Sequence, residues 1–135
     1  MPKKPTPWRI VVVEDDDGLR VAIVRMLNAC GWRSRGFSAS EQFLASSASK
    51  NFDCLIADIY LPGMSGFDLF DTVKIGKPDT QAILITAQDD VQISNRITKA
   101  GASYLHKPFS GDALAEAVRA RMKYHVQDTS LQNDA

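Results

Sequence analysis

The chain contains, close to its N-terminus, the stretch Ile10-Val-Val-Val-Glu-Asp15. Its consecutive β-branched residues predict a strand that is buried on both faces, as the strands of parallel sheets are. The two acids that follow lie at the carboxyl end of this strand, where open α/β sheets bind their ligands. The stretch therefore predicts both a parallel sheet and a polar site at one edge of it.

Further apolar and β-branched segments follow along the chain, and segments with helical spacing separate them. The predicted strands are Ile10–Val13, Trp32–Phe37, Phe52–Ala57, Ala82–Ile85 and Ser103–His106. Trp32–Phe37 is interrupted by charged residues and by Gly36, so we expect it at an edge of the sheet. Strand and helix alternate five times, which predicts an α/β domain with one parallel sheet covered on both faces.

The helical segments are recognised by their apolar spacing and by the residues at their ends. The first runs from Leu19 to a stop at Gly31. Ser38-Ala-Ser-Glu41 fits a capping box, which predicts the start of a second helix. The remaining helices are expected after the loop Leu61–Gly66, over Val91–Ala100, and from Gly111 to about Tyr124. Residues 126–135 are polar and show no periodicity, so we expect a free end or the start of a linker.

The composition limits the class of protein. A chain of 135 residues with 44% hydrophobic and 24% charged residues is typical of one soluble globular domain. Basic and acidic residues cancel to a formal net charge of zero, so bulk charge gives no support for nucleic-acid binding. No apolar run approaches the roughly 20 residues of a membrane span, and the N-terminus lacks the apolar stretch of a secretory signal. We therefore expect a cytoplasmic protein.

Three acidic residues follow predicted strands directly: Glu14 and Asp15 after the first, and Asp58 after the third. An acidic run at a helix start often caps the helix, and Asp16 or Asp17 fits that role. Glu14 and Asp15 stand at the strand end instead, on the rim that all parallel strands share. The mutual repulsion of three carboxylates requires a cation. Because the ligands are all oxygen atoms, we expect Mg²⁺, with Mn²⁺ as an alternative, rather than zinc.

A hydroxyl and an ammonium group are expected on the same rim. Thr86 follows the fourth predicted strand and Lys107 follows the fifth. Asp58 becomes a suitable nucleophile once a metal neutralises the phosphoryl group that it attacks. Lys107 would supply a positive charge, and the Thr86 hydroxyl would donate to a phosphoryl oxygen. Phosphoryl transfer depends mainly on such positioning and charge stabilisation, so the rim predicts a site for a phosphoryl group.

Four stretches in this order match a known pattern. They are Val12-Val-Glu-Asp-Asp16, Asp58-Ile-Tyr-Leu-Pro-Gly-Met-Ser-Gly66, Ile85-Thr-Ala87 and Lys107-Pro-Phe109. Together they resemble the receiver domain of two-component response regulators. The resemblance covers about residues 8–125, which leaves an N-terminal arm over residues 1–7 and a polar tail over residues 126–135. It implies a flavodoxin-like fold, a doubly wound α/β domain with strand order 2-1-3-4-5.

The resemblance also implies a role for each acid. Asp58 is the expected phosphoacceptor, which receives a phosphoryl group from a phosphohistidine of a sensor histidine kinase or of a phosphotransfer protein. Asp15 and Asp58 are expected to bind Mg²⁺ directly, together with the backbone carbonyl of Tyr60. Glu14 is expected to bind the ion through a water molecule.

The same resemblance implies a switch. Thr86 is expected to turn its hydroxyl toward the phosphoryl group, and Lys107 to move from the carboxylate to the phosphate. Tyr104 matches a mobile aromatic residue of the family. Its inward rotation would reshape the surface of the fourth helix, fifth strand and fifth helix. The Lys107-Pro108 peptide bond is expected to be cis, which X-Pro bonds permit.

Two positions of the family control the lifetime of the acyl phosphate. Tyr60 stands two residues after Asp58, and Gln88 two residues after Thr86; both positions tune the access of water. We expect the bulky Tyr60 side chain to shield the phosphoaspartate. His106 is expected on the opposite face of its strand, in a structural or surface role.

Other classes of protein fit less well. A haloacid-dehalogenase-like phosphatase also uses a strand-end aspartate with Mg²⁺, but its Asp-x-Asp-x-Thr pattern is missing from Asp58-Ile-Tyr-Leu-Pro62. A flavodoxin needs a phosphate loop rich in Ser, Thr and Gly where this chain is acidic. A receiver that no longer accepts phosphate is disfavoured because all the expected chemical residues are present.

We therefore expect a phosphoacceptor signalling domain rather than an enzyme. Its partners would be a histidine kinase or phosphotransfer protein and, after phosphorylation, a second copy of the chain; no nucleic acid and no membrane are expected. Gly31–Phe43 and Pro62–Gly66 look most like receivers of transcription regulators of the nitrogen-fixation and nitrate-response type. The alternatives that remain are a transcriptional output and a single-domain relay that acts through protein contact.

Overall fold

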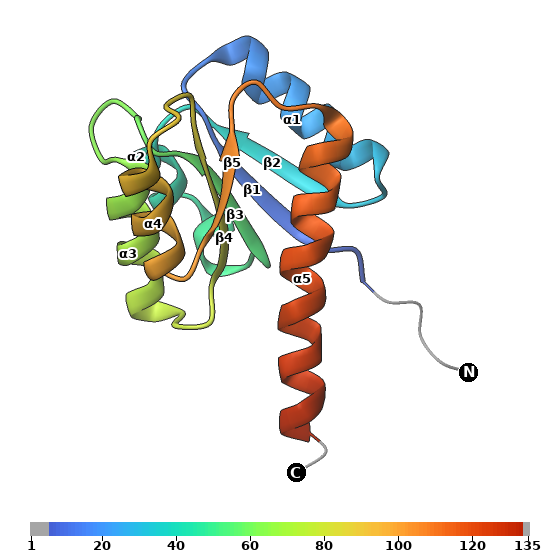
Figure 1. The fold of residues 1–135 in the computed structure, drawn as a ribbon. Coiled ribbons are helices and arrows are strands. Elements are labelled where there is room, and N and C mark those ends of the chain that lie inside the picture. Colours follow the sequence, from blue (N-terminus) through green and yellow to red (C-terminus); the bar gives the residue numbers. More distant parts are fainter. Residues whose placement is uncertain (1–5, 134–135) are drawn as a thin grey trace.

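The computed structural model describes residues 6–133. Its centre is a five-stranded parallel sheet in the order β2-β1-β3-β4-β5, with helices on both faces (Figure 1). The strands are β1 (Arg9–Val13), β2 (Arg33–Phe37), β3 (Cys54–Asp58), β4 (Gln81–Thr86) and β5 (Ser103–His106). The predicted flavodoxin-like architecture, the strand order and the edge position of the second strand are confirmed.

The helices alternate with these strands along the chain. They are α1 (Asp17–Ala29), α2 (Ser40–Leu44), α3 (Gly66–Gly76), α4 (Val91–Lys99) and α5 (Gly111–Asn133), with a short 3₁₀ helix, η1 (Ser47–Lys50), after α2. At the start of α1 the Asp16 side chain accepts a 2.9 Å hydrogen bond from the Leu19 N–H, which is the capping expected for this acidic run. Helices α1 and α5 cover one face of the sheet, and α2, α3 and α4 cover the other (Figure 1).

The central strands are buried on both faces because successive side chains point to opposite sides of a sheet. Val11 and Val13 pack in the core beneath α2, α3 and α4, and Ile10 and Val12 pack in the core beneath α1 and α5. The β-branched run that predicts the first strand therefore contributes to both cores.

The register of the strands brings their carboxyl ends together. Val13 pairs with Ala57, and Asp58 pairs with Ile85. At the next pair of strands the last residue of β4 pairs with the last residue of β5. The residues that end or follow β1, β3, β4 and β5 consequently lie at one edge of the sheet.

The predicted capping box does not form. Helix α2 begins at Ser40, and its N-cap residue makes no side-chain hydrogen bond. The Ser38 N–H and hydroxyl instead donate to the side-chain oxygen of Gln42. Glu41 accepts a hydrogen bond from Met64, in the loop after β3. The prediction of a capping box is wrong because the Glu41 carboxylate, which the capping box requires, binds Met64 instead.

The last helix is longer than predicted. It does not end near Tyr124 but continues to Asn133, because no glycine or proline after Gly111 interrupts it. Figure 1 shows the C-terminal part of α5 extending past the sheet, so this part needs no apolar periodicity. Residues 1–5 and 134–135 lie outside the described residues. No helix in residues 6–133 combines the length and the apolar character of a membrane span.

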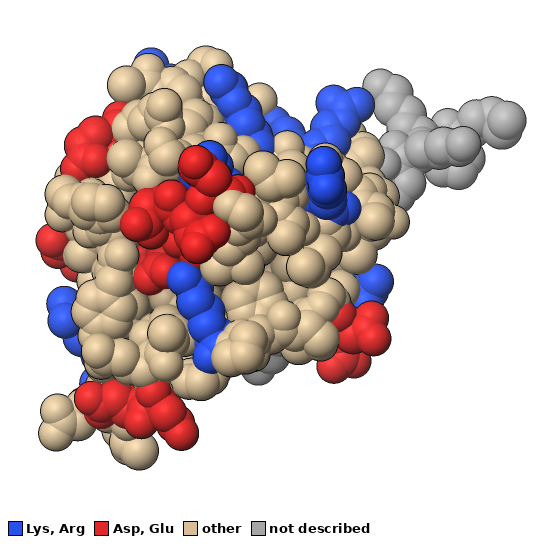
Figure 2. Space-filling view, turned by 90° about the horizontal axis from the view of Figure 1, so that it is seen from above, with Lys and Arg blue, Asp and Glu red and all other residues tan. Residues whose placement is uncertain are grey.

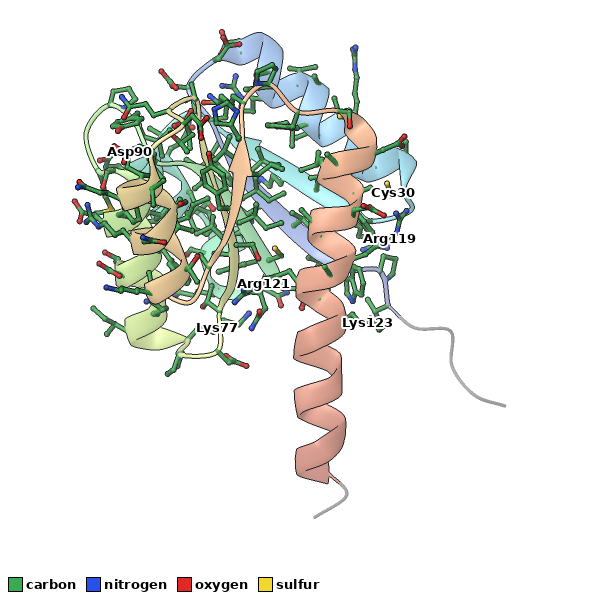
Figure 3. All side chains as sticks on the ribbon, viewed as in Figure 1. Cys30, Lys77, Asp90, Arg119, Arg121 and Lys123 are labelled. Atoms are coloured by element: carbon green, nitrogen blue, oxygen red, sulfur yellow. The ribbon has the colours of Figure 1, made fainter. Side chains whose placement is uncertain are left out.

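One side chain binds α5 to the edge of the sheet at which the strands begin, opposite to the edge formed by their carboxyl ends. Arg121 donates hydrogen bonds to the Gln81 side chain (2.8 Å), to the Ser103 hydroxyl (3.2 Å) and to the Gly101 carbonyl. These acceptors lie at the first residues of β4 and β5 and in the turn before β5. Figure 3 labels Arg121 between α5 and this end of the sheet.

Candidate functional site

The acids predicted to share the rim do lie together. Side-chain oxygens of Glu14, Asp15 and Asp58 all lie within 4.8 Å of one another. Glu14 and Asp58 are buried whereas Asp15 is exposed, so the cluster opens to solvent on one side. Figure 2 views the molecule from above this edge and shows a patch of acidic side chains with basic side chains beside it.

Lys107 neutralises part of this negative charge. Its ammonium group donates a 2.6 Å hydrogen bond to Glu14 Oε1 and a second hydrogen bond to Asp58 Oδ2. Burial alone would lower the pKa of Lys107, but the hydrogen bonds to the two carboxylates outweigh it and the pKa is raised. Lys107 is therefore charged at neutral pH and connects the end of β5 to the ends of β1 and β3.

One carboxylate oxygen in the cluster is left without a partner. Glu14 Oε2 is buried and accepts no hydrogen bond from the described residues. Burial raises the pKa of Glu14, and the hydrogen bond from Lys107 acts in the opposite direction. A buried oxygen without a donor needs a partner, and a hard cation bound by oxygen ligands would supply one. These residues therefore fit the metal ion that the sequence predicts.

The loop after β3 is folded back onto Asp58. The Asp58 Oδ1 atom accepts a 2.8 Å hydrogen bond from the Tyr60 N–H, so the other carboxylate oxygen is the one that faces Lys107. Gly66, the first residue of α3, lies against the end of β3. A Cβ atom on Gly66 would lie only 2.4 Å from the Asp58 carbonyl oxygen, which explains why glycine is required there.

Two residues outside the predicted site hold the far end of this loop. The buried Ser40 hydroxyl donates a 2.9 Å hydrogen bond to the Met64 carbonyl, and the Glu41 carboxylate accepts a 2.7 Å hydrogen bond from the Met64 N–H. This second hydrogen bond lowers the pKa of Glu41. The neighbouring Gly63 has a φ of +78°, and the Glu41 carboxylate occupies the space beside it. No local pattern marks these contacts in the sequence, because the partners are more than 20 residues apart.

Thr86 and Gln88 form the next part of the rim. Thr86 is fully buried, and its hydroxyl oxygen accepts a 3.0 Å hydrogen bond from the Gln88 N–H. The Gln88 side-chain oxygen accepts a 2.9 Å hydrogen bond from the hydroxyl of Tyr60, a residue that is 54% exposed. Tyr60 and Gln88 therefore connect the loop after β3 to the loop after β4.

The end of β5 supplies the remaining predicted residues. Tyr104 is half-buried, and its hydroxyl donates a long, 3.4 Å hydrogen bond to the Gln88 carbonyl. The Lys107-Pro108 peptide bond is cis. The ring of His106 lies 6.3 Å from that of Tyr104, and within the described residues no hydrogen bond joins His106 to the acidic cluster. Sequence and structure therefore agree in keeping His106 out of the site.

This fold and this arrangement of strand-end acids opposed by a lysine define a class of protein. The chain belongs to the response regulator receiver domain family, whose model matches residues 10–119. The family resemblance stated from the sequence motifs is thereby confirmed, and the chain is a receiver domain of the two-component type.

Two curated relatives are transcription regulators. The DNA-binding transcriptional regulator NtrC of Salmonella typhimurium is 36% identical over 118 residues, which cover 86% of this chain and 25% of that protein. The transcriptional regulatory protein FixJ of Bradyrhizobium diazoefficiens is 26% identical over 119 residues, which cover 87% of this chain and 58% of that protein. The chain spans between a quarter and three fifths of the length of these relatives. The expected likeness to receivers of nitrogen-type regulators is confirmed.

A solved structure shows the same fold. The BeF₃-activated receiver domain of DrrB is 28% identical, with a TM-score of 0.79, and the match covers 87% of this chain and 99% of that chain. DrrB is an OmpR/PhoB homologue from Thermotoga maritima.

Proposed function

We propose that Asp58 accepts a phosphoryl group from a phosphohistidine of a sensor histidine kinase or phosphotransfer protein. The domain is then a switch that is modified once per signal and not an enzyme that turns over a separate substrate. One observation supports this most directly. Asp58 and Glu14 share the Lys107 ammonium group, while Glu14 Oε2 is buried without a partner. The site is thus organised in advance for one cation and one phosphoryl group.

The cation in this proposal is Mg²⁺, and Mn²⁺ suits the same oxygen ligands. We assign the direct bonds to Asp15, Asp58 and the backbone carbonyl of Tyr60, and a water-mediated contact to Glu14. When bound, the ion would neutralise oxygens of the phosphoryl group under attack.

The transfer itself exchanges one bond for another. A carboxylate oxygen of Asp58 forms a bond to phosphorus while the phosphorus–nitrogen bond of the donor histidine breaks, and the imidazole nitrogen keeps the electron pair. The product is an aspartyl phosphate. Lys107 pairs with the new phosphoryl oxygens, so its charge is neutralised both before and after the transfer. The similarity to a BeF₃-activated receiver domain supports a site that responds to a phosphoryl-like group.

The switch follows from the hydroxyl groups beside the site. The Thr86 hydroxyl turns to donate to the phosphoryl group and gives up its contact with the Gln88 N–H. The 3.4 Å hydrogen bond from Tyr104 to Gln88 is long and therefore weak, so Tyr104 can leave it at little cost. Inward rotation of Tyr104 then reshapes the surface formed by α4, β5 and α5.

The reshaped surface would control an output by protein contact. Because the relatives NtrC and FixJ are transcription regulators, we assign transcription as the output, with phosphorylation-dependent pairing of two receiver domains as the intermediate step. The alternative is a relay that passes the signal on by contact alone. We place the protein in the cytoplasm and take residues 8–125 as the receiver domain, preceded by an arm and followed by a tail that begins as part of α5.

The test is phosphorylation by acetyl phosphate with and without Mg²⁺, followed by intact-mass spectrometry. Wild type is compared with Asp58→Asn and with Asp71→Asn, a matched control that removes an exposed carboxylate paired with Lys74. Wild type and Asp71→Asn are expected to gain one phosphoryl group in a Mg²⁺-dependent manner, and Asp58→Asn none. Full labelling of Asp58→Asn, or labelling without metal, contradicts the proposal. Release of phosphate over many turnovers would indicate a phosphatase instead.

A further inference from the structure

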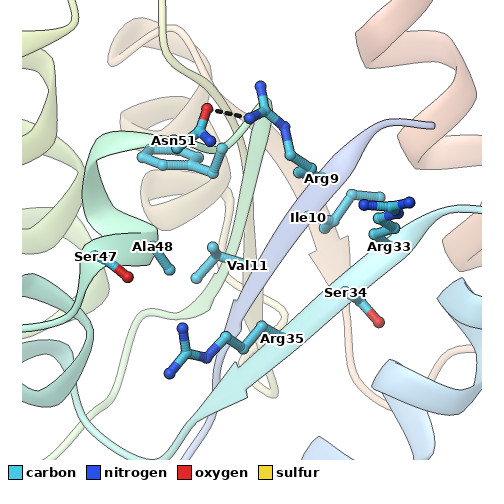
Figure 4. Close-up of a pocket in the computed structure, with 10 residues that line it drawn as sticks. Arg9, Ile10, Val11, Arg33, Ser34, Arg35, Ser47, Ala48 and Asn51 are labelled. Atoms are coloured by element: carbon cyan, nitrogen blue, oxygen red, sulfur yellow. Dashed lines mark hydrogen bonds between the residues drawn. The ribbon is translucent and has the colours of Figure 1, made fainter. Parts of the chain in front are cut away.

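A groove runs along the face of β2 that lies on the side of α2. Because α2 has only five residues and η1 only four, these helices do not cover this edge of the sheet. Two hollows of about 330 and 370 Å³ lie there, and Arg35 lines both. Figure 4 shows Arg35 extending from β2 on the side of Ser47 and Ala48, with Arg9 at the other end of the first hollow.

The groove is positively charged. Arg9, Arg33 and Arg35 line the first hollow, and among residues 6–133 no acidic residue lines either one. Arg9 pairs with Arg33 in the sheet, and Val11 pairs with Arg35. Because side chains alternate between faces, these three arginines project from the same face of the sheet. In a chain with zero net charge, this is a local concentration of positive charge.

Two of these three arginines lack a counter-ion. Arg9 is paired with Asp53, but Arg33 and Arg35 are exposed and form no ion pair with any described residue. The Arg35 guanidinium lies 5.0 Å from the centre of the Phe37 ring, which orients the group without neutralising it. An oriented guanidinium binds the oxygens of a phosphate or carboxylate group in pairs. The groove therefore offers two unpaired guanidinium groups to an anion.

We propose that this groove binds a small organic anion with two or more phosphate or carboxylate groups. Its charged groups pair with Arg33 and Arg35, and its organic part packs on the apolar floor formed by Val11, Ala48 and Phe52. The size of the hollow is at the low end for small-molecule sites, which suits a molecule of nucleotide size or smaller. Arg9 and Arg33 begin their strands, so the first hollow starts at the edge of the sheet opposite to Asp58, and the groove runs from there toward Phe37 at the end of β2.

Charged residues on an edge strand also discourage pairing with another sheet. Preventing such pairing requires only a charged side chain, so lysine would serve as well as arginine. Anion recognition in the groove depends on the planar guanidinium, which lysine does not reproduce. Replacement of arginine by lysine therefore separates the two roles.

The experiment is calorimetric titration of the full chain with pyrophosphate, ADP and citrate, with adenosine as the uncharged control. We expect at least one of the anions to bind and adenosine not to bind. Arg33→Gln/Arg35→Gln is expected to weaken binding at least about tenfold, because it removes charge-assisted hydrogen bonds. Arg33→Lys/Arg35→Lys is expected to weaken it as well. Comparison of pyrophosphate and ADP with citrate distinguishes a phosphate ligand from a carboxylate ligand.

The matched control is Arg25→Gln/Lys99→Gln, which removes the same charge from exposed positions on α1 and α4. It is expected to bind the anion as wild type does. Three results would overturn the proposal. They are an equal loss of anion affinity in the two double glutamine variants, binding as tight as that of wild type by the double lysine variant, and no binding of any probe at millimolar concentration. Unchanged labelling of Asp58 by acetyl phosphate in every variant shows that the fold is intact.

Discussion

The Glu41 carboxylate and the Met64 N–H form a 2.7 Å hydrogen bond between residues that lie 23 positions apart in the sequence. The preceding residue, Ser40, binds the carbonyl of the same Met64. Both backbone groups of Met64 are thus held by the first turn of α2. The loop that contains Tyr60 is therefore held by α2 at Met64, in addition to the contacts of Tyr60 with Asp58 and Gln88, and we expect the contacts with α2 to help position the Tyr60 carbonyl.

Replacement of Glu41 by alanine is expected to loosen the loop after β3. The Met64 amide should exchange faster with solvent, and Mg²⁺ affinity should fall by up to about tenfold, as it does when other groups that orient metal ligands are lost. Amide exchange and a Mg²⁺ titration, both followed by NMR, measure the two effects. The hydrogen bond lowers the pKa of Glu41 below the ordinary value of 4.5. Its contribution to the stability of the folded protein is therefore fully present above pH 4.5. This contribution is lost as the pH falls through the lower pKa that Glu41 has in the folded state.

The control for this prediction is Gln42→Ala in the same helix. The Gln42 side chain accepts hydrogen bonds from Ser38 and none from the loop after β3. It should leave both the Met64 amide and Mg²⁺ binding unchanged. Equal behaviour of the two alanine variants would show that the Glu41 contact does not position the loop.

Gly66→Ala is expected to destabilise the protein by about 3 kcal/mol, the upper end for overpacking. The added Cβ atom would lie 2.4 Å from the Asp58 carbonyl oxygen, and backbone atoms cannot move aside as a flexible side chain does. Gly76→Ala at the other end of α3 meets no atom within 4 Å and should stabilise the protein by about 0.5 kcal/mol. Urea unfolding of both variants measures the difference, and similar free energies of unfolding would contradict it.

Lys107→Met is expected to destabilise the metal-free protein by about 3 kcal/mol, because it leaves buried carboxylates without their counter-ion. The Lys107 ammonium group binds both Glu14 and Asp58. Mg²⁺ should recover much of the lost stability, since a cation restores the missing positive charge. Urea unfolding with and without Mg²⁺ tests this, and a variant as stable as wild type in the absence of metal would disprove it.

Tyr60→Asn is expected to shorten the lifetime of the aspartyl phosphate by about fivefold. This corresponds to a decrease of roughly 1 kcal/mol in the activation free energy of hydrolysis. Tyr60→Phe removes only the hydrogen bond to Gln88 and keeps the ring. An intermediate lifetime for Tyr60→Phe would show that the bridge and the ring both exclude water. The loss of phosphate over time, followed by mass spectrometry, measures all three proteins, and identical lifetimes would rule out shielding by Tyr60.

The stability of the metal-free protein should depend on the protonation of Glu14. Burial raises the pKa of Glu14 above the ordinary value of 4.5, so the charged form is disfavoured in the folded state. Stability is then gained as the pH falls through the raised pKa, and this gain is complete below 4.5. Without metal, Glu14→Gln should be more stable than wild type at neutral pH, and the difference should shrink as the pH falls. A difference that does not change with pH would contradict this prediction.

The sheet and the rim of the site could be predicted because local patterns determine them. The β-branched run Ile10–Val13 contributes to both cores, and a strand that does so must be central. The acids, Thr86 and Lys107 follow predicted strands, and parallel strands bring their carboxyl ends to one edge. The order of the strands, in contrast, was predicted from the family resemblance, because local patterns do not report which strands are neighbours.

The contacts of α2 and the end of α5 could not be predicted for two different reasons. Ser38 and Glu41 have the spacing of a capping box, but Glu41 binds Met64 across the fold, and no local pattern reports such a contact. The end of α5 has no apolar periodicity because it extends past the sheet (Figure 1). Apolar periodicity therefore could not show how far this helix continues.

Arg121 couples α5 mechanically to the sheet. Its guanidinium group binds the first residues of two neighbouring strands and the turn between α4 and β5. A shift of β5 along its axis must therefore either drag α5 with it or break several hydrogen bonds at once. We therefore expect β5 and α5 to move together, so that a displacement of the strand next to Lys107 is carried to the part of α5 beyond the sheet.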